Sequence, residues 1–283
     1  MSLATTLRWH DGRLVDDEVG EGGEGGEGGG EGGGGDGHAS RDAGASEARR
    51  GPTRVADSWL VVDGAVRALD VHRDRFAGSV REAAPGLDVD GFWSAAVAAL
   101  PREGRWFPRV ELLGDDLLLH LRPAPGARRS VVLATASSDP RTEPLVKGPD
   151  LEALGALRRE VATRGAEEAV LLDADGWVVE GAWSSLLWWR GDALCMPADD
   201  LPRLPGVTVR TVLTLAAVLG VDVLHERVTP EQLDGFEIWS LSALHGVRIA
   251  TRWVDGPTTA EEPGRLATWQ RRLDALRRPL PAA

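Results

Sequence analysis

One lysine, Lys147, stands among 31 arginines in this sequence of 283 residues. An even split of the charged residues among four types would give on the order of fifteen lysines. A lysine amine can lose its proton and attack a carbonyl carbon, whereas the guanidinium of arginine stays protonated. The pattern therefore predicts that position 147 needs an amine for covalent chemistry. Composition alone leaves a second interpretation open, in which Lys147 is an idle surface residue.

Two features could bind a phosphate group. Gly206-Val207-Thr208 precedes an apolar periodic segment and reads as the start of a helix, where unpaired backbone N–H groups and the helix dipole favour an anion. Arg75 could add a planar, bidentate donor. Taken singly, the first feature is equally an ordinary helix cap and the second an exposed helix arginine.

Glu180 ends an apolar run, Val178-Val179-Glu180, and a buried carboxylate needs a cationic or hydrogen-bonding partner. A protonated pyridine nitrogen in the ring of a bound cofactor would be such a partner. A half-exposed glutamate in a surface ion pair is the alternative at this position.

The elements that must position these residues suggest a mixed α/β (α+β) chain in four segments. We expect an N-terminal strand or loop over 1–18, a disordered Gly/Glu-rich insert over 19–50, a small α+β domain over 51–138 and a larger α/β domain over 139–283. The elements expected in the small domain are a hairpin over 58–70 turning at Asp63-Gly64, helices over 70–83 and 89–100, and strands over 109–113, 116–122 and 130–136.

In the larger domain Lys147 falls on a loop before a helix that starts near Pro149-Asp150 and stops at Gly165. A hairpin over 168–173 and 177–181 carries Glu180 at its end. The remaining expected elements are strands over 185–189, 193–196, 237–242 and 247–254, helices over 208–219 and 266–276, and a capping box at Thr229-Pro230-Glu231-Gln232.

The composition limits the classes of partner that this protein is expected to bind. The net charge of -12 argues against nucleic acid or an anionic membrane, so a small-molecule substrate is the simpler expectation. The one cysteine, Cys195, excludes an internal disulfide and a multi-cysteine metal site, and no metal is expected. The first residues lack the apolar core of a signal peptide, and no apolar run is long enough to span a bilayer. We expect a cytoplasmic protein.

Four motifs in order resemble aminotransferase class IV, the fold-type IV pyridoxal-phosphate enzymes that include branched-chain and D-amino-acid aminotransferases and 4-amino-4-deoxychorismate lyase. The resemblance runs from about Ser58 to Gly256. Its motifs are Lys147 before a helix, the hairpin with Glu180-Gly181 and Ser184-Ser185-Leu186-Leu187-Trp188, the stretch Leu204-Pro205-Gly206-Val207-Thr208-Val209-Arg210, and Ser242-Ala243-Leu244-His245-Gly246-Val247-Arg248.

The resemblance implies a two-domain fold with pyridoxal 5'-phosphate between the domains, usually in a homodimer. It implies that Lys147 holds the cofactor as a Schiff base and shuttles the proton, and that Glu180 pairs with the pyridine nitrogen. Arg75, in the His-x-x-Arg pattern, would bind the phosphate. The groups that would complete the phosphate site are those of Val207, Thr208, Ser242 and Ala243.

Three departures from the family pattern concern the substrate. Ser185 replaces the usual asparagine, Val209 replaces the usual arginine, and the chain has no tyrosine. The resemblance leaves two reactions open: a lyase acting on an aminodeoxychorismate-like substrate to release pyruvate and 4-aminobenzoate, which the His245–Arg248 stretch favours, and an amino-acid transaminase. Arg109 and Arg122 are candidate carboxylate anchors for either. A non-catalytic relative acting as a binding module is the alternative from another class.

Overall fold

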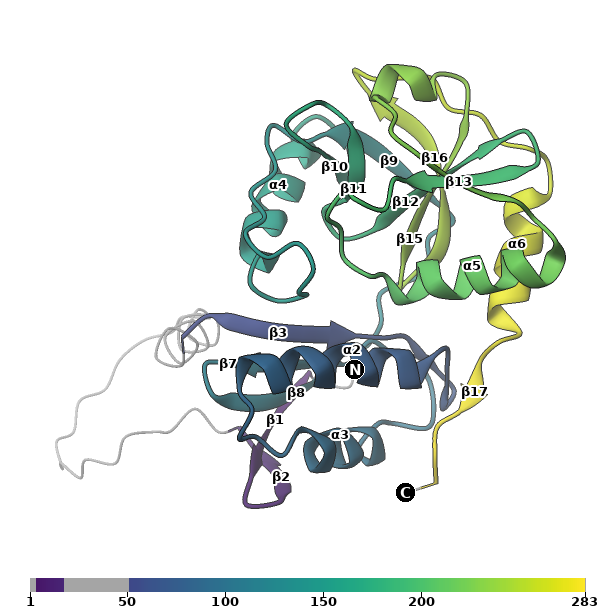
Figure 1. Ribbon diagram of the computed structural model, residues 1–283. Helices are drawn as coiled ribbons and strands as arrows, with labels where there is room; N and C mark the ends of the chain where they lie inside the picture. The colour runs from purple at the N-terminus through teal and green to yellow at the C-terminus, as the bar shows by residue number, and fades with distance from the viewer. Residues whose placement is uncertain (1–3, 18–50, 283) are drawn as a thin grey trace, which may run out of the picture.

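The computed structural model describes residues 4–17 and 51–282. The insert expected over 19–50 lies outside the described residues. The remainder folds into two lobes, each built around a sheet of its own (Figure 1).

The smaller lobe is an antiparallel five-stranded sheet in the order β2-β1-β8-β7-β3. Its strands are β1 (Thr5–His10), β2 (Arg13–Asp16), β3 (Thr53–Ser58), β7 (Arg109–Leu113) and β8 (Asp116–Leu121). The helices α2 (Leu69–Ala83) and α3 (Val89–Ala98) pack beside it. Both helices were expected from their apolar spacing, and Asp88 caps α3 by accepting a hydrogen bond from the backbone of Gly91.

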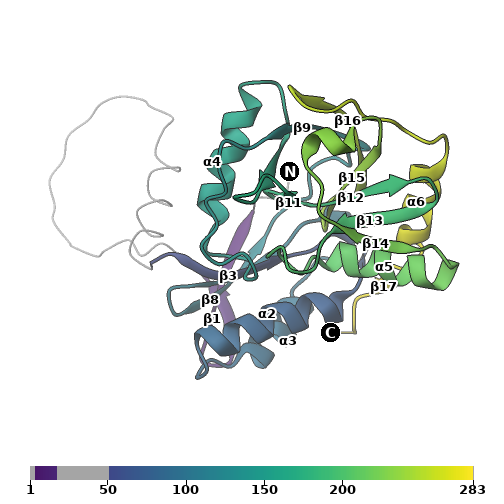
Figure 2. The ribbon, with the colours of Figure 1, turned by 45° about the horizontal axis from the view of Figure 1, so that its top comes forward.

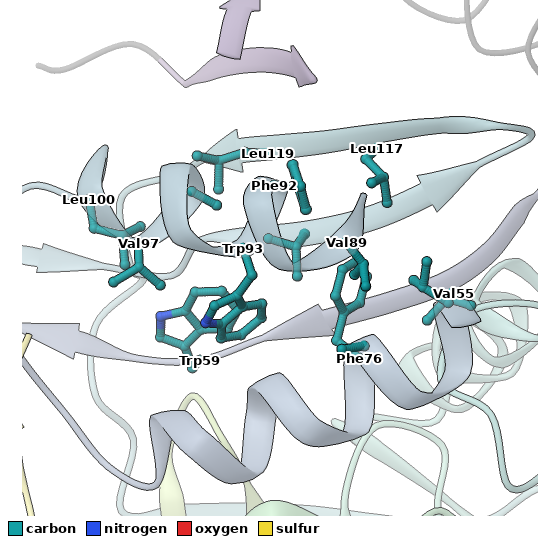
Figure 3. Packing of buried hydrophobic residues seen from close by; sticks show 14 of the residues in the cluster. Val55, Trp59, Phe76, Val89, Phe92, Trp93, Val97, Leu100, Leu117 and Leu119 are labelled. Carbon is teal, nitrogen blue, oxygen red and sulfur yellow. The ribbon is translucent and has the colours of Figure 1, made fainter. Parts of the chain in front are cut away.

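Aromatic side chains fill the space between these helices and the sheet. Trp59 and Trp93 have ring centroids 4.9 Å apart, and Phe76 packs against Phe92 at 6.1 Å. Figure 3 shows these rings between the two helices and the strands, with leucines of β8 on the far side. Burial of such rings supplies much of the lobe's hydrophobic stabilisation and fixes α2 over β3.

The larger lobe is a mixed eight-stranded sheet in the order β11-β10-β9-β16-β15-β12-β13-β14. Its strands are β9 (Ser130–Thr135), β10 (Glu168–Leu172), β11 (Val178–Gly181), β12 (Ser185–Arg190), β13 (Ala193–Pro197), β14 (Val223–Glu226), β15 (Glu237–Ser242) and β16 (Gly246–Val254). The helices are α4 (Leu151–Ala162), α5 (Val207–Leu219), α6 (Arg265–Asp274) and the 3-10 helix η1 (Pro230–Leu233). The capping box predicted at Thr229 is confirmed.

A third, four-stranded sheet consists of two-residue strands in the order β17-β5-β4-β6. These are β4 (Val61–Val62), β5 (Ala65–Val66), β6 (Arg105–Trp106) and β17 (Arg278–Pro279). The pairing of β17 with β5 returns the C-terminal segment to the smaller lobe (Figure 2). The side chain of Leu280 is buried in that lobe's core. None of the helices in the described part of the chain is long and apolar enough to cross a bilayer.

The structure differs from the expected elements at several places. The hairpin expected over 58–70 turns at Asp63-Gly64, where both residues have positive φ, but it is reduced to the short strands β4 and β5. Strands β3 and β14 were not expected. The domain boundary expected after residue 138 stays a prediction, and β9, which precedes it, pairs with β10 and β16 in the larger sheet.

Candidate active site

Lys147 lies on the loop before α4, at the point where the two lobes meet. Figure 1 shows β3 and α2 on the side of the smaller lobe that faces this loop and α5. The backbone N–H of Ala56 on β3 donates a 2.6 Å hydrogen bond to the carbonyl of Lys147. Three hydrogen bonds from Thr142 and Glu143 to the carboxylate of Asp150 close the loop at its base. Residues from both lobes therefore fix the lysine backbone.

Gly148 permits this close approach. Its φ is +152°, and a Cβ atom built on it would lie 2.8 Å from the carbonyl oxygen of Arg54 and 2.8 Å from the Cα of Val55. A side chain at 148 would push the lysine loop away from β3. The position needs glycine for its space as well as for its backbone conformation.

We expect Gly148→Ala to lower the free energy of unfolding by about 1–3 kcal/mol, because the strained backbone and the contact with β3 act together. Chemical denaturation of the variant checks this. Gly126→Ala is the control, since Gly126 has ordinary backbone angles and a Cβ at that position would have no neighbouring atom within 4 Å. Equal stabilities of the two variants would contradict this account of the loop.

The Lys147 amine faces a group of charges on the smaller lobe. Burial lowers the pKa of Lys147 to about 8; Asp57 opposes this shift, whereas Arg75, Arg109 and Arg122 add to it. With a pKa of about 8, about a tenth of the amines are unprotonated at pH 7, far more than for an ordinary lysine. The unprotonated amine is the form that can attack a carbonyl carbon.

Asp57 is the centre of that charge group. It is fully buried on β3 and accepts two hydrogen bonds from Arg75, 2.9 Å from Nε and 2.8 Å from Nη2, and one of 2.8 Å involving His72 Nδ1. Burial favours the protonated acid, but Arg75 and His72 outweigh it and hold the pKa of Asp57 well below its usual range. Asp57 therefore stays ionised and fixes the direction of the Arg75 guanidinium.

Arg75 and Glu180 flank the same turn before α5. Nη1 of Arg75 donates to the carbonyl of Pro205 at 3.2 Å, and the backbone N–H of Leu204 donates to Oε1 of Glu180 at 3.2 Å. Asp57 and Arg75 both act on the charge of Lys147, and Arg75 and Glu180 contact two adjacent residues of the turn.

Glu180 is 6% exposed and pairs with a residue that sequence reasoning missed. Nη1 of Arg141 donates to Glu180 Oε1 at 2.5 Å. Burial raises the pKa of Glu180 to about 7 although Arg141 and the Leu204 N–H act against the shift.

The raised pKa predicts a pH dependence of stability. The unfolded chain releases this proton near pH 4.3, whereas the fold retains it up to about pH 7. The free energy of unfolding therefore falls by about 3–4 kcal/mol as the pH rises between these values. We expect Glu180→Gln to lack that fall in denaturation curves of the cofactor-free protein measured from pH 4 to 8. Glu152→Gln, on the exposed face of α4, is the control. A parallel pH dependence in wild type and Glu180→Gln would count against this description of Glu180.

The predicted phosphate site has donors of the right kind. Helix α5 begins at Val207 after Gly206, and no side chain caps its first N–H groups. Val207, Thr208 and Ala243 line one small cavity together with His72 and Arg67. That space is about 10 Å³, roughly one water molecule.

Ser242 is partly buried at the end of β15, next to Ala243, and its Oγ accepts a hydrogen bond from the N–H of His245 at 3.3 Å. Ser185, which departs from the family pattern, lies against the start of α5: a Cβ at Gly206 would be 2.8 Å from Ser185 Oγ. The same turn borders a largely apolar cavity of about 250 Å³, whose lining includes Ser185 and Val209.

The carboxylate anchors suggested by the sequence lie on the smaller lobe. Arg109 forms an ion pair with Glu111, while Nε of Arg122 donates to the carbonyl of Phe107 at 3.2 Å. Burial lowers the pKa of Arg122, and the neighbouring Arg109 lowers it further. Together with Lys147 they form a cationic group for which Glu111 is the nearby counter-charge. The described residues contain no cluster of three or more side chains suited to hold a metal ion.

These features define a two-lobed mixed α/β protein with a partly buried lysine and a helix N-terminus at the junction. The chain belongs to the amino-transferase class IV family, whose model matches residues 54–253. The resemblance found in the sequence and the predicted fold class, that of the fold-type IV enzymes, are both confirmed.

Known proteins similar to this chain include a branched-chain-amino-acid aminotransferase from Pseudomonas aeruginosa, 32% identical over 75 residues, or 26% of this chain and 24% of that protein. The chain's matched part spans about a quarter of the length of the first curated relatives. Among solved structures, a hypothetical aminotransferase from Mycobacterium tuberculosis in its apo form is 21% identical, with a TM-score of 0.73, covering 97% of this chain and 98% of that one. Its PLP-bound form also matches, with a TM-score of 0.69.

A protein from Legionella pneumophila assigned as a 4-amino-4-deoxychorismate lyase is 13% identical, with a TM-score of 0.68, covering 80% of this chain and 93% of that one. At these identities the structural likeness shows the shared fold and does not distinguish a lyase from a transaminase.

Proposed function

We propose that the chain is a pyridoxal-phosphate enzyme acting on the amino group of a carboxylate-bearing small molecule. The observation that carries the proposal is the placement of the sole lysine beside the Asp57–Arg75 pair, with Arg75 and Glu180 on either side of the turn that starts α5. The family match and the PLP-bound form of the Mycobacterium tuberculosis protein support the same cofactor.

The residues fit this cofactor through their donor chemistry. Uncapped N–H groups at Val207 and Thr208 and the guanidinium of Arg75 would bind its phosphate, with Ser242 and Ala243 completing the site. Glu180 would face the pyridine nitrogen. When bound, pyridoxal phosphate supplies an aldehyde for an amine and a ring that draws electron density from the substrate.

Lys147 has two roles in this mechanism. Its amine would hold the cofactor, and Nζ would accept a proton from the substrate carbon and return it. A pKa of about 8 suits both tasks, because Nζ then changes protonation near the working pH. Glu180 would pair with the ring nitrogen, and Asp57 keeps Arg75 in place.

Arg109 and Arg122 would bind a carboxylate of the substrate near Lys147. Both reactions left open by the sequence suit this charge. The transaminase is supported by the curated relatives, which are branched-chain aminotransferases, and the lyase by the cationic group, since its substrate carries two carboxylates. A non-catalytic binding module has no support from the family match or the relatives.

The proposal also includes a cytoplasmic homodimer. The family resemblance implies the homodimer, and the exposed apolar side chains of Leu145 and Trp183, 61% and 53% exposed, lie on the lysine loop and on the turn after β11, where a second copy could cover them. The cytoplasmic location is proposed from cysteine usage, because Cys195 has no second cysteine to pair with.

Product identification tests the reaction. The purified holoenzyme is incubated with 4-amino-4-deoxychorismate in one arm, and with branched-chain amino acids plus 2-oxoglutarate in the other. Formation of pyruvate and 4-aminobenzoate identifies the lyase, and formation of glutamate identifies the transaminase. A protein that binds no pyridoxal phosphate and turns over neither substrate would overturn the proposal.

A further inference from the structure

Arg141 is a buried arginine with no role in the family motifs quoted from the sequence. Its side chain is 5% exposed and lies between two carboxylates, those of Asp139 and Glu180. Its Nε and Nη2 atoms donate to Asp139, with Nη2 2.6 Å from Oδ2, while Nη1 donates to Glu180 Oε1 and to the carbonyl of Pro202 at 3.0 Å. Every side of the guanidinium is therefore engaged.

The two carboxylate oxygens of Glu180 differ in their hydrogen bonds. Oε1 accepts from both Arg141 and the Leu204 N–H, while Oε2 accepts no hydrogen bond from any residue in the described ranges. A purely structural ion pair would favour a bidentate contact that uses both oxygens. This arrangement instead fixes the carboxylate through one oxygen and leaves the other for a further partner.

We propose that Arg141 is a positioning residue that holds Glu180 through Oε1 and directs its other carboxylate oxygen to the pyridine nitrogen of the cofactor. The inference rests on the proposed function. Burial raises the pKa of Glu180 to about 7, and Arg141 acts against that shift, so it favours the charged carboxylate that pairs with a protonated ring nitrogen. Asp139 in turn holds Arg141, so Asp139, Arg141 and Glu180 form one network of two ion pairs.

Arg141 also connects Glu180 to the segment that carries Lys147. Arg141 stands six residues before Lys147 and directly precedes Thr142, whose backbone and hydroxyl bind Asp150 at the base of the lysine loop. A displacement of Arg141 would therefore shift both the partner of the ring nitrogen and the segment that carries the amine.

The ring nitrogen itself provides the readout. We would load the apo-protein with pyridoxal phosphate labelled with 15N in the ring and record the 15N chemical shift between pH 6 and 9. The wild type is expected to show a protonated nitrogen at neutral pH. Arg141→Gln is expected to shift the signal toward the unprotonated value, as Glu180→Gln does, and Arg141→Lys to restore most of the protonated signal. Arg164→Gln, an exposed arginine bonded to the Thr135 carbonyl, is the control.

A double-variant cycle keeps the test decisive if Arg141→Gln folds poorly. Arg141→Gln is expected to weaken cofactor binding on the order of tenfold in the wild-type background and to have little effect in Glu180→Gln, because the two residues act through one contact. An unchanged 15N shift in Arg141→Gln, or equal losses in both backgrounds, would overturn the inference. Failure of the wild type to bind the cofactor would instead overturn the proposed function.

Discussion

Lys147→Ala is expected to lose the visible absorption band of the bound cofactor and to reduce turnover by at least about 10²–10⁴-fold, the contribution typical of a positioned proton-transfer group. The variant lacks both the amine that holds the cofactor and the base that moves the proton. As the chain has no second lysine, no neighbouring side chain can replace that amine. Steady-state kinetics and an absorption spectrum of the purified variant measure both effects.

Lys147→Arg separates charge from covalent chemistry. The guanidinium preserves a positive charge beside Asp57 and would keep the local ion pairs, but it does not form an imine. We expect it to fold as well as the wild type and to be as inactive as Lys147→Ala. Substantial turnover in either variant would show that Lys147 is not the catalytic amine.

Arg75→Ala is expected to affect stability and cofactor binding together. Asp57 is completely buried, and without Arg75 its carboxylate keeps His72 and the backbone N–H of Ser58 as close partners but loses its arginine counter-charge. Breaking a buried ion pair from one side costs about 3–5 kcal/mol. Loss of a charged hydrogen bond to the phosphate would weaken cofactor binding by about 1.5–3 kcal/mol, on the order of 10- to 100-fold.

The sign of the pH effect follows from Asp57. In the wild type its pKa is depressed, so its stabilising contribution is present above the unfolded value of about 3.9 and disappears only as the pH falls below that value. In Arg75→Ala burial is less compensated and the pKa of Asp57 rises, so acid relieves the buried charge. The deficit in stability should therefore be largest at neutral pH and smaller at pH 4.

Urea denaturation at pH 7 and pH 4, with a cofactor titration at pH 7, tests these expectations. Arg73→Ala is a matched control on the same helix, because Arg73 is 53% exposed and pairs only with the adjacent Asp74 among the described residues. A stability deficit in Arg75→Ala that is the same at both pH values, or no larger than that of Arg73→Ala, would contradict the role given to the Asp57–Arg75 pair.

Periodic apolar spacing was sufficient to predict the long elements. The helices α2 and α3 and the strands β7 and β15 lie where the sequence indicated. The helices repeat buried residues at helical spacing, whereas the two strands are short runs in which nearly every residue is buried. Strand β3 was missed for the opposite reason. Its sequence, Thr-Arg-Val-Ala-Asp-Ser, carries a buried aspartate that no pattern of apolar residues reveals.

The candidate site was predictable only through its motif residues. Sequence reasoning named Lys147, Arg75 and Glu180, but Asp57 and Arg141 hold two of these side chains in place and stand outside every motif. Their signal is a tertiary one: each is a charged residue whose burial depends on a partner far along the chain, 18 residues away for Asp57 and Arg75 and 39 for Arg141 and Glu180. A single sequence does not record such pairings.

Strand β14 was not predicted from the sequence for a different reason. Its residues Val223–Glu226 alternate poorly and are largely exposed, and the strand is placed by parallel pairing with β13 at the edge of the larger sheet. Pairing at an edge depends on the neighbouring strand more than on local propensity. The functional residues do not depend on this edge, so its omission did not affect the predicted site.

Reductive trapping tests the central claim most directly. The holoprotein is treated with borohydride, which converts a Schiff base to a stable secondary amine, and is then digested and sequenced by mass spectrometry. We predict the phosphopyridoxyl mass on Lys147 and its absence from Lys147→Ala. Recovery of Lys147 without that added mass from a protein loaded with cofactor would contradict the account.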